Sequence, residues 1–329
     1  MIEIKKYPSD FIVEELLDFE LEEDGEHLFL YIEKNNLNTK YLCRKLADIC
    51  QIPVREVAYS GLKDRFAITR QWISINKKYM ENLPDIGKIV EEDGGYWQIL
   101  DKKLHRKKLK IGSHKRNKFE LTVRNISPEI KTVAEYKLQQ KIFPNFFGNQ
   151  RFGYNNLDEI RQLVALDKLP KKQDRTWLFS VLRSYLANIQ IAMRIKNNIL
   201  NKFISGDMAI FSNSNARFTV KKEEIDSLNI RAEKLEIKPS VCLIGKSEHF
   251  LEDTEIFQLT NQVLGKYQQE FAYLRKYAQQ TDFRPANFSP DNLSYEYLDA
   301  ETMRLNFTLP RGSFATVLID EIFGENIAL

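Results

Sequence analysis

The hydrophobic periodicity of the chain changes twice along its 329 residues. Near both ends, apolar residues alternate with other residues as in strands, for example from Leu28 to Ile32 and from Leu305 to Leu309. From about residue 154 to residue 288 the spacing becomes that of long helices. A chain of this length can hold two packed domains. The order of these patterns predicts a helical segment between two strand-rich ends.

The helical segment contains two long amphipathic patterns separated by a strand-like stretch. The first pattern is formed by Trp177, Leu178, Val181, Leu182, Tyr185, Leu186, Ile189 and Met193, and it could continue to Leu200. The stretch from Met208 to Val220 reads as strand and is broken at Ser212 to Asn215. The second helical pattern runs from about Glu255 to Tyr277. The middle of the chain is therefore expected to be a largely helical α+β region.

Turn and cap signals divide the strand-rich ends. Phe11 to Glu33 is expected to form two strands around the turn Asp24 to Glu26. Asn38 can cap a helix that follows it, and Ser127-Pro128 combines a cap with proline at the first helical position. The inner stripe of this second helix is expected to be Ile130, Val133, Ala134, Lys137 and Leu138. Ser313 to Ile322 is expected to form a closing helix. These elements provide the scaffold for the polar motifs described next.

The run Tyr59 to Trp72 places Asp64 directly between Lys63 and Arg65. Gly61 lets the backbone turn or approach a ligand closely, and Phe66 to Ile75 has the composition of a strand. Asp64 is therefore predicted at a bend that enters a strand, where a rigid scaffold can position a catalytic side chain. On composition alone, the alternative is a solvated surface cluster of three charges.

The segment from Lys102 to Lys118 is the most basic in the chain, with nine lysines and arginines and no acidic residue. Such density can provide a footprint for the phosphates of a nucleic acid, although a solvated charged face is the usual alternative. The candidates for contact with an RNA backbone are Lys63, Arg65, Arg106, Lys107, Lys108, Lys110, Lys115 and Arg116.

The basic segment ends in a strand that carries an amide and an aromatic ring. The period of two places Asn117, Phe119, Leu121 and Val123 on one side of this strand. An amide can read the edge of a base, and an aromatic ring can stack on its plane. Asn117 and Phe119 are therefore candidate base contacts. Phe11 and Phe314 taken alone would be read as core residues.

Five sequence blocks, in order along the chain, together resemble the TruD family of tRNA pseudouridine synthases. The blocks are Asp10 to Glu15, Tyr59 to Trp72, Gly112 to Phe119, Pro144 to Gly153 and Leu309 to Thr316. They reach both ends of the chain, which makes the resemblance specific. The likeness is weaker between residues 154 and 288.

This resemblance implies a fold, a reaction and a set of site residues. The fold would be α+β, with a mixed or antiparallel sheet in a discontinuous catalytic domain (1–153 plus 289–329) and an insertion domain (154–288). Asp64 would be the catalytic residue, and Phe11, Asn117, Phe119 and Phe314 would contact the substrate. The reaction would convert a uridine at position thirteen of tRNA, flipped out of the stack, to pseudouridine without a cofactor.

Composition excludes several other classes. Cys43, Cys50 and Cys242 are odd in number and widely spaced, so they suggest neither a disulfide framework nor a zinc site. The four histidines show no metal-ligand spacing. No apolar run approaches the length of a membrane span, and residues 1–10 lack the apolar core of a signal peptide. We therefore expect a cytoplasmic protein with tRNA as its partner, no membrane contact, no metal, and a monomeric state by default.

Two rival functions remain open on the sequence. A non-catalytic RNA-binding or RNA-folding protein would use the same basic and aromatic residues and would leave Asp64 with a structural role. A metal-dependent nuclease is disfavoured because no carboxylate or histidine cluster of suitable spacing occurs. The sequence also leaves open which basic residue pairs with Asp64, because neighbours in an extended segment project to the opposite face.

Overall fold

The computed structural model describes residues 2–92, 94–214, 216–246, 254–324 and 327–328. It divides into two compact units. The first comprises Met1–Gln139, Pro290–Ala315 and Ile319–Leu329, and the second comprises Gln140–Ser289 and Thr316–Leu318. The sequence predicts domain boundaries after residues 153 and 288. Assignment of these parts as catalytic and insertion domains stays a prediction.

The first unit is built on one mixed sheet of eleven strands, with the order β15-β16-β8-β2-β5-β3-β7-β6 and with β1, β4 and β17 pairing beside this path. The strands are β1 (Ile2–Ile4), β2 (Phe11–Leu17), β3 (His27–Asn35), β4 (Ala58–Tyr59), β5 (Ile68–Asn76), β6 (Val90–Glu92), β7 (Gly95–His105), β8 (His114–Arg124), β15 (Asp291–Tyr297), β16 (Met303–Pro310) and β17 (Ile327–Ala328). Within the described residues, β2 with β5 and β1 with β17 are the parallel pairs. This mixed sheet with flanking helices confirms the predicted α+β class.

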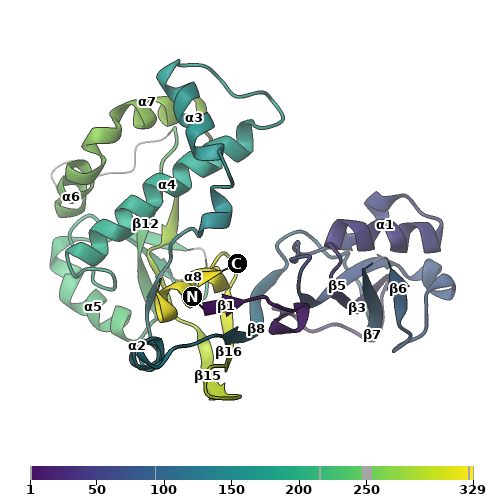
Figure 1. Cartoon of the computed structure of the whole chain (residues 1–329). Coiled ribbons are helices and arrows are strands. Elements are labelled where there is room, and N and C mark those ends of the chain that lie inside the picture. The colour runs from purple at the N-terminus through teal and green to yellow at the C-terminus, as the bar shows by residue number, and fades with distance from the viewer. Residues whose placement is uncertain (1, 93, 215, 247–253, 325–326, 329) are drawn as a thin grey trace. The chain divides into compact units, whose positions relative to one another are not determined.

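Helix α1 (Thr39–Cys50) covers part of this sheet, lying over β3, β5 and β7 (Figure 1). Asn38 caps the helix as predicted, because its side chain accepts a hydrogen bond from the Tyr41 N–H. Leu42 and Leu46 of α1 are fully buried against a cluster that includes Leu30 and Ile73. The alternation along β3 places Leu28, Leu30 and Ile32 on the face that α1 covers.

The same alternation gives β2 and β8 a common face. Val13 lies opposite Phe119, and Glu15 lies opposite Asn117 in the register of these two antiparallel strands. Val13 also lies beside Thr69 of β5, which in turn lies opposite Lys34 of β3. One face of the sheet therefore carries the predicted amide and aromatic ring next to buried charged residues.

Two helical predictions in this part of the chain need correction. Helix α2 (Pro128–Leu138) begins at the predicted Ser127 cap, but its expected inner stripe is only partly buried. Ala134 is its buried residue, Ile130, Lys137 and Leu138 are partly buried, and Val133 is half-exposed. Helix α8 (Ala315–Phe323) begins two residues later than predicted, with Phe314 as its N-cap residue. Helix α2 therefore buries little of its surface, although its apolar residues recur at helical spacing.

The second unit combines helices with a small antiparallel sheet, β11-β10-β12-β13. Its elements are α3 (Asn156–Ala165), α4 (Arg175–Lys196), α5 (Ile225–Glu233), α6 (Glu255–Leu264), α7 (Gln268–Tyr277), β9 (Phe143–Pro144), β10 (Met208–Phe211), β11 (Arg217–Thr219), β12 (Ile237–Leu243), β13 (Asp282–Pro285) and β14 (Asn287–Phe288). The break between β10 and β11 is as predicted. Helix α4 ends at Lys196, short of Leu200, and the second helical pattern is divided into α6 and α7.

Candidate active site

Asp64 lies in the loop of residues 60–67 between β4 and β5, with its side chain about half-exposed at 49 %. The main chain of this loop is fastened to α1 and β5. The Lys63 N–H donates to Thr39 Oγ1 at 3.0 Å, and Gln71 Nε2 donates to the Gly61 carbonyl at 3.2 Å. Because both partners belong to regular elements, the loop presents the Asp64 carboxylate from a fixed base.

Lys34 of β3 binds the main chain of the same loop. Its side chain is fully buried, and its Nζ donates to the main-chain carbonyl of Asp64 at 2.7 Å. Burial lowers the pKa of the Lys34 ammonium to about 8, while the charge of Asp64 opposes that shift. The Lys34 Nζ is therefore a buried donor that fixes the main chain of Asp64.

The ion-pair partner of Asp64 is Lys5, whose Nζ lies 2.7 Å from Asp64 Oδ2. The Lys5 side chain is only 13 % exposed, and its Nζ also lies 4.0 Å from the centre of the Phe11 ring. Lys5 adopts a left-handed backbone conformation (φ 59°), which is uncommon for a residue other than glycine. The sequence did not reveal this partner, because 59 positions separate it from Asp64 and it belongs to no periodic pattern.

Two of the predicted aromatic residues are joined to this ion pair through Phe11, which lies under Lys5. Phe11 packs edge-on against Phe119, with ring centroids 6.2 Å apart, and Phe119 stacks on Phe307 at 5.2 Å. Phe11 and Phe119 are 4 % and 8 % exposed, so both contribute to the core of the sheet. Sequence reasoning missed Phe307, although its place in the alternating strand Leu305 to Leu309 was the available signal.

Lys63, a candidate for contact with the RNA backbone, is almost completely buried and has two partners within the protein. Its Nζ lies 2.9 Å from Glu15 Oε2 and donates to Asn117 Oδ1 at 2.8 Å, and its side chain is only 6 % exposed. Burial raises the pKa of Glu15, and the neighbouring Lys63 charge opposes that shift. Lys63 therefore belongs to a buried polar cluster, which we call the Glu15–Lys63–Asn117 cluster.

A buried histidine closes one side of this cluster. The main-chain N–H of His114 donates to Ser60 Oγ at 2.7 Å, so the Ser60 hydroxyl is free to donate to the ring nitrogen His114 Nδ1 at 2.6 Å. Burial lowers the pKa of His114 to about 4, and the nearby positive charges of Lys63 and Arg311 act in the same direction. A Cβ at Gly61 would lie 2.7 Å from His114 Cε1, which explains the glycine of this motif. His114 is thus a neutral structural group.

The basic segment forms the end of β7, a loop at residues 106–113 and the start of β8. The Gly112 N–H donates to the Ser60 carbonyl at 2.8 Å, which joins this loop to the Asp64 loop. Among the residues predicted to contact the RNA backbone, those with exposed side chains are Arg65, Arg106, Lys107, Lys110, Lys115 and Arg116. Lys108 is partly exposed. Several of them form surface ion pairs, such as Arg106 with Glu22 at 3.3 Å. Such exposed ion pairs contribute little free energy, so a phosphate can readily replace the carboxylate.

Phe314 follows β16 at the start of α8 and is half-buried. Leu309, five positions earlier, lies opposite Asn117 in the register of β16 with β8. Arg311 lies between them in sequence, and its Nη1 donates to the Gly112 carbonyl at 3.1 Å. Arg311 belongs to the block Leu309 to Thr316 but was not among the predicted site residues. It is an exposed cation beside the loop of residues 106–113.

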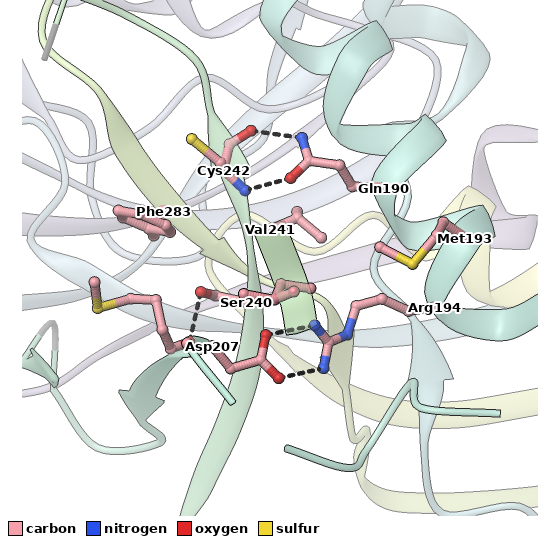
Figure 2. Close-up of a pocket in the computed structure, with 11 residues that line it drawn as sticks. Gln190, Met193, Arg194, Asp207, Ser240, Val241, Cys242 and Phe283 are labelled. Atoms are coloured by element: carbon pink, nitrogen blue, oxygen red, sulfur yellow. Dashed lines mark hydrogen bonds and ion pairs between the residues drawn. The ribbon is translucent and has the colours of Figure 1, made fainter. Parts of the chain in front are cut away.

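A small cavity in the second unit is structural in character (Figure 2). Its volume of about 20 Å³ suits a single water molecule. Gln190 of α4 bonds the main chain of Cys242 with both ends of its amide, and the buried Arg194 pairs with Asp207 at 2.7 Å. These contacts fasten α4 to the strands and leave no exposed reactive group.

Two features are absent from the described part of the chain. No helix there has the length and apolar character that crossing a membrane requires. Among the same residues, no three His, Cys, Asp or Glu side chains are grouped so that they could hold a metal ion. The arrangement that stands out is an aspartate paired with a lysine that lies over the Phe11 ring, and next to it in sequence a lysine that binds the Asn117 amide.

Comparison with known proteins identifies the family. The family model for tRNA pseudouridine synthase D (TruD) matches residues 2–163 and 158–322. The tRNA pseudouridine synthase D of Hydrogenovibrio crunogenus is 32 % identical over 327 residues, covering 97 % of this chain and 92 % of that protein. The protein of the same name from Pseudomonas syringae is 33 % identical, with coverage of 97 % and 90 %. A crystal structure from Methanosarcina mazei assigned to tRNA pseudouridine synthase D has a TM-score of 0.75 at 22 % identity, covering 98 % of this chain and 93 % of that one, and therefore the same fold.

Proposed function

The chain belongs to the TruD family of tRNA pseudouridine synthases, and from this premise we propose that it isomerises a uridine at position thirteen of tRNA, with Asp64 as the catalytic residue. The position is carried over from the family resemblance. The reaction breaks the bond between N1 of uracil and C1′ of the ribose, turns the base and joins C5 to C1′. It needs neither oxidation nor an energy source, so we propose that it uses no cofactor and no metal.

The observation that carries the proposal is the Lys5–Asp64 ion pair above the Phe11 ring. A carboxylate beside a bound base needs a cation or hydrogen bonds to remain charged, because desolvation favours its protonated form. Lys5 supplies that cation, and Lys34 holds the main chain of Asp64. Asp64 is the half-exposed member of this group and can reach a substrate.

Residues around Asp64 would hold the detached base. We assign Asn117 a hydrogen bond to the base edge, Phe119 a stacking role, and Phe11 and Phe314 further contacts with the nucleoside. Phe307 covers one side of the Phe119 ring, so a base would use the rest of that ring. Buried aromatic rings suit a flat ring that must be retained while it turns.

The exposed cations would bind the tRNA backbone while the uridine is flipped out. Arg65 lies next to Asp64, and the loop of residues 106–113 is bonded to the Asp64 loop through Gly112 and Ser60. Phosphates held on this loop would therefore be fixed relative to the carboxylate. Extruding a base requires a few kcal/mol, which backbone contacts can supply. We propose a monomer that acts on tRNA in the cytoplasm.

Product mapping tests this function. Purified protein is incubated with unmodified tRNA transcripts in buffer containing EDTA, and pseudouridine is located by carbodiimide adduct formation and primer extension. We expect one stop that reports position thirteen and none with Asp64→Asn. Glu120→Gln is the matched control, because Glu120 is a comparably exposed carboxylate that pairs with Arg304 at 3.5 Å on β8. Binding without any product, in EDTA and with added Mg²⁺, would favour the RNA-binding alternative.

A further inference from the structure

Lys63 fixes which end of the Asn117 amide faces the site. An ammonium group can only donate hydrogen bonds, so the atom 2.8 Å from Lys63 Nζ must be the carbonyl oxygen Oδ1. The opposite assignment would place an NH₂ group against an NH₃⁺ group. The orientation of this amide therefore follows from chemistry, whereas most asparagine amides must be assigned from weaker network arguments.

Lys63 is itself held in place by Glu15. The Glu15 side chain is fully buried, and its Oε2 lies 2.9 Å from Lys63 Nζ. Glu15 and Asn117 are directly opposite each other on β2 and β8, so Lys63 lies between two neighbouring cross-strand positions. Separating a buried ion pair is costly. The ammonium is thus a fixed point against which Asn117 is oriented.

The other end of the amide is left available. Within the described residues, no group accepts a hydrogen bond from Asn117 Nδ2, and Asn117 is only partly buried. A partly exposed amide with a fixed oxygen and an unused N–H presents a donor of defined position. Uracil carries an acceptor at O4, whereas cytosine carries a donor, its amino group, at the same place.

We propose that Glu15 and Lys63 are a positioning pair that presents Asn117 Nδ2 to O4 of the target base, and that this pair thereby selects uridine against cytidine. The inference rests on the proposed function and concerns the base that the same site accepts. A cytosine would place its amino group against the Asn117 N–H, leaving two donors unpaired. An unmade hydrogen bond of this kind corresponds to a discrimination of about tenfold or more.

The test measures binding to three tRNA transcripts that differ only at the target nucleotide, which is uridine, cytidine or an abasic ribose. Every protein in this test also carries Asp64→Asn, so that the uridine is not converted during the measurement. Fluorescence anisotropy at fixed salt gives each dissociation constant, and the abasic transcript reports the contribution of the RNA backbone alone. We expect the protein with Asp64→Asn alone to bind the uridine transcript about tenfold more tightly than the cytidine transcript. The cytidine transcript should bind no more tightly than the abasic one.

Two variants separate base reading from general stability. Asn117→Asp replaces the donor with an acceptor, so its preference should reverse towards cytidine. Glu15→Gln/Lys63→Met removes both charges together, leaves the amide free to rotate, and should bring the uridine-to-cytidine ratio close to one. A purely structural pair would not change this ratio in the molecules that remain folded.

The matched control is Glu14→Gln/Lys118→Met. These residues occupy the adjacent cross-strand pair of β2 and β8, on the opposite face, and their side chains lie 3.8 Å apart. This variant should retain the ratio of the protein with Asp64→Asn alone even if it binds every transcript more weakly.

Each outcome decides between the two claims. Equal binding of the uridine and cytidine transcripts by Asp64→Asn, where the wild type forms pseudouridine, would overturn the selection and leave the proposed function standing. If Asn117→Asp loses affinity equally for the uridine and cytidine transcripts, the contact would be with O2, which the two bases share, and the assignment to O4 would be refuted. An unchanged ratio in Glu15→Gln/Lys63→Met would remove the positioning role. A wild type that forms no pseudouridine would refute the function and this inference together.

Discussion

Replacing Lys5 with methionine removes the cation that holds Asp64 and leaves most of the Lys5 side-chain volume in place. Opposite charges about 4 Å apart attract by about 4 kcal/mol at the effective dielectric constant of a protein surface. The half-exposed Asp64 carboxylate is partly screened by water, so the charge-assisted hydrogen bond should be worth about 1.5 to 3 kcal/mol. We therefore expect kcat/KM for tRNA to fall by about 10- to 150-fold.

Single-turnover kinetics with saturating enzyme measure the chemical step of this variant, and filter binding measures tRNA affinity separately. The matched control is Lys6→Met, because Lys6 carries the same charge one position away and pairs with Glu3 at 3.2 Å on the surface. Lys5→Arg should recover part of the rate. A Lys5→Met enzyme with the single-turnover rate of the Lys6→Met control would refute the reasoning.

Three further predictions follow from the site. The pKa of His114 is lowered to about 4 in the folded chain, so between about pH 6.5 and pH 4 the His114 imidazole is protonated only in the unfolded chain. The free energy of unfolding therefore falls as pH falls through this range. Chemical unfolding at several pH values should show a shallower fall in His114→Asn, by up to about 1.4 kcal/mol per pH unit. In Arg106→Gln/Lys107→Gln, the log–log slope of tRNA affinity against salt should become about 1.5 units shallower; an unchanged slope would exclude both residues from phosphate contact. Gly61→Ala should destabilise the fold by about 1 to 3 kcal/mol in a thermal melt, because its Cβ would meet the buried His114 ring, whereas Gly265→Ala has open space and should melt like the wild type.

Local signals in the sequence were sufficient for most of the fold. The alternation in β3 and β8 and the caps at Asn38 and Ser127 each depend on a few neighbouring residues, and the structure has all of them. Helix α2 shows the limit of this approach, since its spacing predicted an inner stripe of which only Ala134 is fully buried and Val133 is half-exposed. Periodicity reports what a helix could bury but cannot report what lies beside it.

The site was less accessible to sequence reasoning, because its main contacts join distant parts of the chain. Asp64 could be selected from its motif, but Lys5 is brought to it by the path of β1 and β2, and no pattern records that approach. The burial of Lys63 was hidden for the same reason, since only the pairing of β2 with β8 places Glu15 and Asn117 around its Nζ. A lysine next to the candidate aspartate looks like a phosphate contact until its buried partner is known.

The most direct test of the account is tritium release from tRNA labelled at C5 of uridine. Joining C5 to C1′ expels the hydrogen of C5, so released tritium counts completed isomerisations. We predict release by the wild type without added metal and none by Asp64→Asn, whose affinity for tRNA should stay within a few-fold of the wild type. Release by Asp64→Asn at the wild-type rate would contradict the assignment of Asp64 as the catalytic residue.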